Sequence, residues 1–225
     1  EIIKTKMDPI PKIQLENFME EKKHFIILHV EQGNETPYYL IDGGYRVAYK
    51  RVGNQSVVAT SIDLKNLVLK GMNKTFDTLP TELHIKDATF NKLRIEYEKR
   101  TNKDFEEKDL FSFGLVTKDG QLTYAGALFA DDYLVYQSRV FCTRWDGLTK
   151  TGGRMEATDD KEFEGNLLFL LENTLNFIRV NTRKMWKKGA LYREEFPDYP
   201  ERAIQETIVN ALIHRDYSVI GSEVH

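Results

Sequence analysis

One helix near the C-terminus of the 225-residue chain constrains its fold most strongly. From Pro200 to Tyr217 the sequence reads PERAIQETIVNALIHRDY, and proline suits the first turn of a helix, where its missing N–H costs nothing. Asp198 lies just upstream and is expected to cap the free amides. Apolar residues then recur at helical spacing, which predicts that one face packs on a core: Ala203, Ile204, Ile208, Ala211 and Leu212.

A second feature of this helix is its polar edge. Arg202, Glu206, Asn210 and His214 follow one another at intervals of four, so they share one side of the helix. Such an edge can be a solvated face and nothing more. However, asparagine is a poor helix former in mid-helix. The chain also continues into the dense polar run from His214 to Tyr217.

The pattern ExxxNAxxHRDY resembles the N-box helix of the gyrase, histidine-kinase and MutL type of ATPase (GHKL). More narrowly, it is similar to bacterial RecG-related proteins and transcriptional regulators that pair a Schlafen AlbA-type domain with a GHKL-like ATP-binding domain. The resemblance implies that Glu206 is catalytic, orienting or activating the attacking water. It also implies that Asn210 binds the Mg²⁺ that bridges the phosphates, and that His214 belongs with Asn210 to the cofactor site.

These implied roles agree with the chemistry of the side chains. A carboxylate such as Glu206 can position a water, and the amide oxygen of Asn210 is a hard ligand suited to Mg²⁺. Four-residue spacing presents both groups to the same phosphate tail. The density of His214, Arg215 and Asp216 also suggests a hydrogen-bonded knot that anchors the end of the helix, which favours a structural role for these three residues over a catalytic one.

Composition excludes several classes of function. A formal net charge of −3 gives no overall basic signature, so any nucleic-acid contact must use local patches. The single cysteine, Cys142, excludes an internal disulfide and a cysteine-based zinc site, and it is predicted to be a buried strand residue. No stretch is long and apolar enough to span a bilayer. We therefore expect a cytoplasmic protein without a membrane partner.

The first third of the chain reads as strands followed by a helix. Strands are predicted at 24–30, 38–41 and 45–52, and Ser61 is expected to cap a helix that ends at Gly71. The run Ala48-Tyr49-Lys50-Arg51-Val52-Gly53-Asn54 resembles the strand "AYVRVGS" of Schlafen AlbA-type domains, and the likeness covers about residues 8–72. That family's N-terminal half is absent from this chain, so its nuclease activity is not assigned.

The strand at 45–52 carries the candidate nucleic-acid-binding residues. Arg46, Lys50 and Arg51 could contact phosphates, and Tyr45 and Tyr49 make the strand aromatic as well as basic. The alternative is that these are the exposed residues of an ordinary antiparallel strand.

The middle of the chain, residues 75–135, reads as helix, helix and hairpin. A helix is predicted from Asp87 to about Arg100, a short one around 105–111, and a hairpin at 115–124 with Asp119-Gly120 in a type I′ turn. This order is winged-helix-like, but the candidate recognition helix carries charges of both signs. The run from Gly114 to Phe129 is similar to the segment that joins the two domains in the related family, which favours a connector.

Residues 136–225 are assigned to the GHKL-like domain. We predict a strand at 138–145, a surface loop at Gly152-Gly153 in preference to a phosphate cradle, and the longest helix from Asp159 with Gly165 inside it. Residues 162–168 resemble the family's "EFEGNL". A cluster of cations follows, which could bind an anionic partner or form the solvated end of the helix: Arg179, Arg183, Lys184, Lys187 and Lys188. A strand is expected at 191–196.

The sequence thus predicts an α+β protein with an AlbA-type part (1–74), a connector (75–135) and the helical start of a GHKL-like domain (136–225). The chain reads as a fragment: in the family the adenine-binding and glycine-rich boxes follow the N-box. We expect the full-length protein to bind ATP and Mg²⁺, with little ATP binding by these residues alone. The expected function is transcriptional regulation with DNA as the partner. The alternative is a non-enzymatic DNA-binding or assembly scaffold, and homo-oligomerisation is compatible with both.

Overall fold

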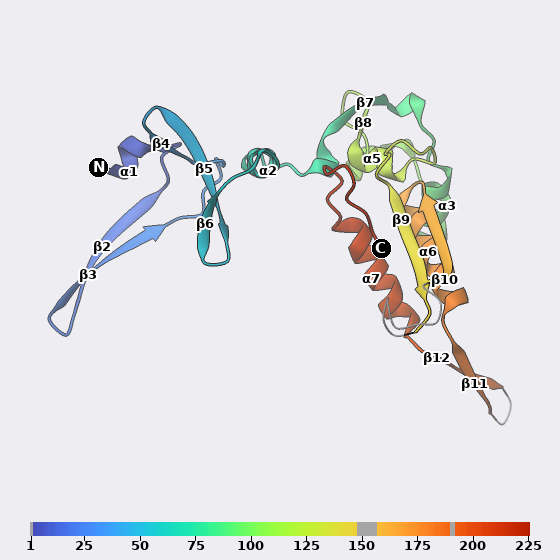
Figure 1. Cartoon of the computed structure of the whole chain (residues 1–225). Coiled ribbons are helices and arrows are strands. Elements are labelled where there is room, and N and C mark those ends of the chain that lie inside the picture. Colours follow the sequence, from blue (N-terminus) through green and yellow to red (C-terminus); the bar gives the residue numbers. More distant parts are fainter. Residues whose placement is uncertain (1, 148–156, 190–191) are drawn as a thin grey trace. The chain divides into compact units, whose positions relative to one another are not determined.

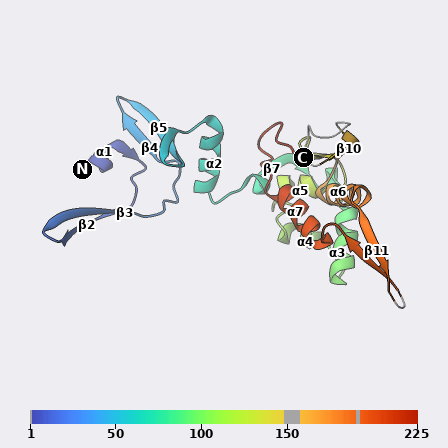
Figure 2. The ribbon, with the colours of Figure 1, turned by 60° about the horizontal axis from the view of Figure 1, so that its bottom comes forward.

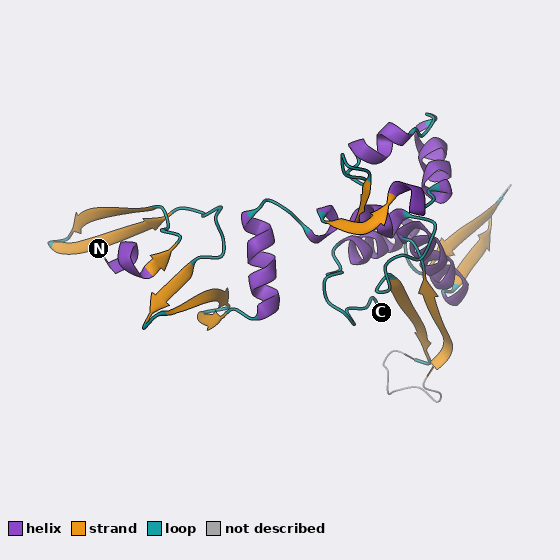
Figure 3. Ribbon diagram, turned by 90° about the horizontal axis from the view of Figure 1, so that it is seen from above, coloured by secondary structure: helices purple, strands orange, loops and turns teal. Residues whose placement is uncertain are grey.

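A computed structural model describes residues 2–147, 157–189 and 192–225 (Figure 1). The protein belongs to the α+β class, with several small antiparallel sheets beside its helices (Figure 3). The chain divides into two compact units, Glu1–Thr75 and Phe76–His225. The division lies next to the boundary at residue 74 that the sequence predicts, and each unit is described by itself below.

The first unit contains a four-stranded antiparallel sheet in the order β1-β4-β5-β6. A separate hairpin pairs β2 with β3, and α2 follows the sheet. The bounds of these elements are α1 Ile2–Lys6, β1 Met7–Asp8, β2 Ile13–Glu20, β3 Lys23–Val30, β4 Tyr39–Asp42, β5 Tyr45–Val52, β6 Gln55–Val58 and α2 Ser61–Gly71.

The three predicted strands of this unit are confirmed as β3, β4 and β5, whereas α1, β1, β2 and β6 were not predicted. The cap of its helix also differs from the prediction. Thr60, and not Ser61, caps α2: its hydroxyl accepts from the amide of Asp63, and Asp63 accepts in return from the Thr60 amide. This reciprocal capping box places Ser61 inside the first helical turn.

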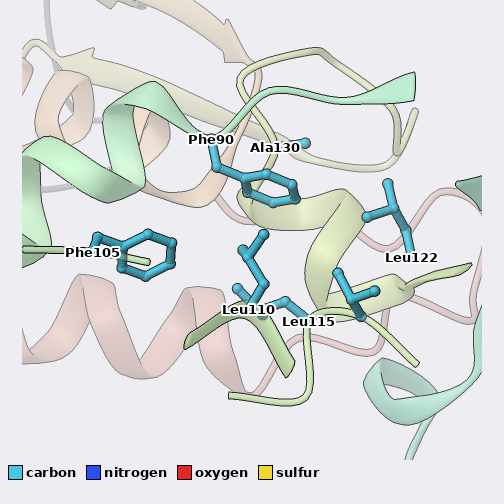
Figure 4. Close-up of a cluster of buried hydrophobic side chains, with 7 residues drawn as sticks. Phe90, Phe105, Leu110, Leu115, Leu122 and Ala130 are labelled. Atoms are coloured by element: carbon cyan, nitrogen blue, oxygen red, sulfur yellow. The ribbon is translucent and has the colours of Figure 1, made fainter. Parts of the chain in front are cut away.

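The second unit begins with a small helical layer held by β7 and β8. Its bounds are η1 Phe76–Thr78, β7 Pro80–His84, η2 Ile85–Asp87, α3 Asn91–Thr101, α4 Glu107–Ser112, β8 Gln121–Thr123 and α5 Tyr124–Phe129. Leu122 is fully buried in its core, which also contains Phe90, Phe105 and Leu110 (Figure 4). The order of helix, helix and hairpin follows the expectation for the connector.

Two details of this layer correct the sequence prediction. Asp87 ends a 3-10 turn and accepts from the His84 amide, while α3 begins at Asn91. The Asp131 carboxylate caps α3 from a distant part of the chain, accepting from the amides of Asn91 and Lys92 at 2.6 and 3.0 Å.

The hairpin turn also differs from the predicted type I′. A type I′ turn needs a positive φ at both central residues. Here the Gly120 amide bonds to the Thr117 carbonyl at 2.9 Å, and within the turn only Gly120 has a positive φ, of 82°. The Asp-Gly pair therefore sits one position later than a type I′ turn requires.

The rest of the second unit packs two long helices on a strand pair (Figure 1). Its bounds are β9 Arg139–Trp145, β10 Ala157–Glu164, α6 Leu167–Asn181, β11 Lys184–Lys188, β12 Arg193–Pro197 and α7 Glu201–Ile213. Val140 and Cys142 of β9 meet Leu170 and Phe177 of α6 in its core. Cys142 is buried in a strand, as predicted, and burial raises the pKa of its thiol.

The longest helix is confirmed as α6, but its predicted start at Asp159 is wrong, because residues 157–164 form β10 and pair with β9. Asn166 is the true N-cap of α6 and accepts from the Phe169 amide at 2.8 Å. Gly165 lies between strand and helix with a φ of 148°, a conformation that side-chain-bearing residues rarely adopt. The glycine thus serves the turn and not close helix packing.

The cationic run after α6 also differs from its expected form. The helix ends at Asn181, and Lys184–Lys188 is β11, paired with β12 in a hairpin. The predicted strand at 191–196 corresponds to Arg193–Pro197, with Leu191 outside the described residues. The predicted loop at Gly152-Gly153 also falls outside them.

Candidate functional site

Helix α7 is fixed in place by its apolar face. Ile208 and Leu212 are buried in the core that α6 and β9 form, and Ile204 is half-buried beside them. Ala203, although predicted to face the core, is exposed. No side-chain acceptor caps the helix at Pro200, so the predicted capping by Asp198 is wrong. The Asp198 amide instead donates to the Arg183 carbonyl at 3.3 Å.

The polar edge of α7 lies on the side away from this core. Glu206 and Ile208 are two residues apart, which places them about 160° apart around the helix axis. Glu206, Asn210 and His214 are all exposed, and helix geometry spaces successive members by about 6 Å along the axis. Within the described part of the chain these three side chains make no hydrogen bond or ion pair. The structure therefore brings the predicted site residues onto one open edge.

The end of α7 forms the hydrogen-bonded knot that the sequence suggests. Tyr217 is buried, and its hydroxyl donates to the Leu212 carbonyl at 2.9 Å. Burial raises the pKa of this phenol to about 12. Asp216 accepts from both the amide and the hydroxyl of Ser218. His214 joins the knot only through its main chain, since its amide donates to the Asn210 carbonyl.

Arg215 ties this knot to the strand pair beneath it. Its Nη1 donates to the main-chain oxygen of Arg139 at 3.0 Å, and its Nη2 donates to the Ser222 carbonyl. The guanidinium also lies 4.9 Å from the centre of the Tyr217 ring. Burial lowers the pKa of Arg215. Arg139 precedes Arg215 by 76 residues, so no local pattern could predict the contact between them.

A groove of about 410 Å³ lies at the other end of α7, between that helix, α6 and the β11–β12 hairpin. Its lining combines three cations, one carboxylate, a threonine and apolar or aromatic side chains: Arg179, Arg183, Lys184, Glu201, Thr182, Leu175, Ile178, Pro197, Tyr199 and Ile204. The groove does not include Glu206 or Asn210. Sequence reasoning noted its cations but not the groove, because the hairpin that forms its wall was expected to be a helix end.

The candidate nucleic-acid-binding residues of β5 do not form one patch. Side chains alternate along a strand, so Arg46 and Lys50 share a face and Arg51 points to the other. Arg46 pairs with Asp8 at 2.8 Å, and Lys50 pairs with Asp63 at 2.7 Å. Arg51 donates to the Gly53 carbonyl at 3.2 Å within its own turn.

The Lys50 contact changes the acid-base behaviour of its partner. Its hydrogen bond, together with those from Thr60, lowers the pKa of Asp63 to about 2. Phosphate binding by Arg46 or Lys50 would compete with these carboxylates.

Comparison with solved structures shows a likeness in fold. No protein-family model matches the chain, and no curated protein matches it. Its fold is similar to the crystal structure of the DIP2311 protein from Corynebacterium diphtheriae, with 18% sequence identity and a TM-score of 0.52. The match covers 96% of this chain and 42% of that protein. At this identity the likeness concerns the fold alone.

Two properties of the described residues bear on the site. None of their helices combines the length and the apolar character that crossing a bilayer requires. The same residues contain no group of three or more His, Cys, Asp or Glu side chains placed to hold a metal ion. A Mg²⁺ ion at the α7 edge would thus need oxygen ligands from a phosphate or from water besides Asn210.

Proposed function

We propose that this chain is part of a nucleotide-dependent DNA-binding regulator, and that the polar edge of α7 binds Mg²⁺·ATP in the full-length protein. One observation carries the proposal. Glu206, Asn210 and His214 stay exposed on one edge, while Ile208 and Leu212 on the opposite side hold the helix in the core. The resemblance of this helix to the GHKL N-box assigns a role to each of the three groups.

The side chains of this edge suit a magnesium-bound phosphate. The amide oxygen of Asn210 is a hard ligand, and the carboxylate of Glu206 can orient a water molecule. Neither side chain is hydrogen-bonded to another described residue, so no such bond has to break before a ligand binds. When bound, Mg²⁺·ATP would supply the phosphoryl group and the charge that the edge recognises. Glu206 would hold the attacking water, and His214 would contact the nucleotide.

Hydrolysis by the full-length protein tests the assigned role of Glu206. Glu206→Gln keeps the shape of the side chain but removes its charge, so it should lower kcat by about 100-fold or more. Glu172→Gln is the matched control, because Glu172 is an exposed carboxylate on α6 that pairs with Lys92. If wild type hydrolyses ATP and Glu206→Gln hydrolyses it at the same rate, this role is refuted.

A second candidate function, assembly through a scaffold, is favoured by the β2–β3 hairpin. Two-stranded hairpins are marginally stable alone, and this one leaves large apolar side chains exposed on both strands: Leu15, Phe18, Met19, Phe25, Ile26, Leu28 and Val30. A second copy of the chain could cover them. Sedimentation equilibrium should then detect a dimer that Ile26→Glu dissociates, whereas a wild-type monomer would exclude this assembly.

A further inference from the structure

The β11–β12 hairpin is an exposed arm of the second unit. It extends from the body that α6 and α7 form (Figures 1 and 2). Its strands pair in register from Lys184 opposite Pro197 to Lys188 opposite Arg193. Every residue from Arg183 to Lys188 is exposed. A protruding two-stranded ribbon of this kind has the dimensions that the major groove of duplex DNA admits.

The arm concentrates positive charge in a protein whose net charge is −3. Between Arg183 and Lys188 the sequence RKMWKK contains four cations and no acid. Strand alternation puts Lys184, Trp186 and Lys188 on one face and Met185 and Lys187 on the other. A local patch of this density attracts a polyanion even when the whole chain is acidic.

The two faces of β11 differ in their surroundings. Lys187 lies opposite Glu194 in the register, so a carboxylate neighbours it. On the other face Trp186 lies opposite Glu195 in the register, and Lys184 lines the groove at the base of the hairpin with Arg179, Arg183 and Glu201. Arg179 is paired with Glu201 there, and an incoming phosphate would compete with that carboxylate. The Lys184 face thus continues the positive surface of the groove.

Length and aromatic content favour nucleic acid over an acidic protein. From Lys184 to Lys188 the strand advances about 14 Å, and a duplex strand places one phosphate per roughly 3.4 Å of its axis. Trp186, 52% exposed, lies between these two lysines on their face. An exposed indole beside lysines can pack on sugars or bases, as aromatic side chains do in nucleic-acid sites.

We propose that the β11–β12 hairpin is a duplex-DNA-binding arm, with Lys184, Trp186 and Lys188 forming the contacting face and Arg183 its base. The inference rests on the proposed DNA-binding function but moves a principal contact away from β5. Phosphates would bind to the lysines without regard to sequence, so the arm would supply affinity and salt dependence more than base selection.

The test measures binding of the chain to a labelled 24-base-pair duplex by fluorescence anisotropy across a salt series. Lys184→Gln/Lys188→Gln should lower the magnitude of the slope of log K against log[salt] by about 2. Lys187→Gln, on the opposite face, is the matched control. It should change the slope less than Lys184→Gln alone or Lys188→Gln alone. Circular dichroism would verify that each variant is folded.

A local readout accompanies this measurement. The chain has two tryptophans, so in a Trp145→Phe background the emission of Trp186 reports on the arm alone. Its emission should change on adding duplex and saturate together with the anisotropy. An unchanged emission while the duplex binds would place the contact elsewhere and overturn the inference.

The outcomes separate this inference from the proposed function. If DNA binding persists unchanged in the double variant but is lost in Arg46→Gln/Lys50→Gln, the arm is refuted and DNA binding through the first unit is supported. If wild type binds no duplex at 50 mM salt, both DNA assignments fail, while ATP binding is tested independently. Equal binding to an acidic polypeptide of matched charge would indicate a protein partner and also overturn the inference.

Discussion

Arg215 donates from Nη1 to the main-chain oxygen of Arg139 at 3.0 Å, which joins the end of α7 to the first residue of β9. Arg139 in turn pairs with Glu162 of β10 at 3.0 Å, and its guanidinium lies 4.5 Å from the centre of the Tyr136 ring. The polar run after the candidate site is therefore part of the framework that holds α7 on the strand pair.

Replacing Arg215 should destabilise the second unit. Arg215→Met keeps much of the aliphatic stem but removes donors to two main-chain oxygens, and hydrogen bonds from charged groups contribute about 1.5–3 kcal/mol each. We expect a loss of about 3 kcal/mol in the free energy of unfolding, measured by urea denaturation. His214→Ala is the neighbouring control and should change stability by at most about 0.5 kcal/mol. Equal stability of Arg215→Met and wild type would contradict the anchoring role.

Removal of the Tyr217 hydroxyl should have a smaller effect that depends on pH. Tyr217→Phe loses the bond to the Leu212 carbonyl, at a cost of about 1 kcal/mol at pH 7. Because the folded pKa of about 12 lies above the ordinary value of 10.0, folding favours the protonated phenol. This contribution is complete below pH 10 and is lost as pH rises through 12. The stability difference between wild type and variant should therefore shrink above pH 10, and a constant difference would argue against the buried phenol.

The ion pair in the first unit can be tested by titration. Lys50→Met removes the principal cause of the low pKa of Asp63, so NMR should find this pKa shifted from about 2 toward 3.8. Since the folded pKa is depressed, the wild-type contact stabilises above pH 4 and is lost as pH falls toward 2. Lys65→Met on the exposed side of α2 is the control. An Asp63 pKa that is the same in Lys50→Met and wild type would refute the pair.

Local patterns predict the parts of the fold that local forces determine. The period of Ile204, Ile208 and Leu212 identifies α7, and the same spacing places Glu206 and Asn210 on one edge. By contrast, residues 157–164 have a helix-like composition, but pairing with β9 makes them a strand. Pairing with the preceding strand overrides weak local propensity.

The candidate site likewise combines parts that the sequence predicts with parts that it does not. Its exposed edge can be predicted because i,i+4 geometry is a property of one helix. The caps and anchors cannot: Asp131 caps α3 from 40 residues away, and the partners of Arg215 belong to β9 and the segment after α7. The groove depends on the β11–β12 hairpin, whose lysines lie in a run that reads equally well as a charged helix end.

The central claim is that α7 binds a magnesium nucleotide through Asn210. Isothermal titration calorimetry of Mg²⁺·ATP into the full-length protein tests it most directly, comparing wild type with Asn210→Ala and with the control Asn173→Ala. Asn173 is a half-buried asparagine on α6 whose side chain donates to the Phe169 carbonyl of its own helix. The account predicts binding by wild type and by Asn173→Ala, and an affinity at least about tenfold lower in Asn210→Ala, a loss of about 1.4 kcal/mol. Equal affinity in all three proteins, or no binding by any of them, would contradict it.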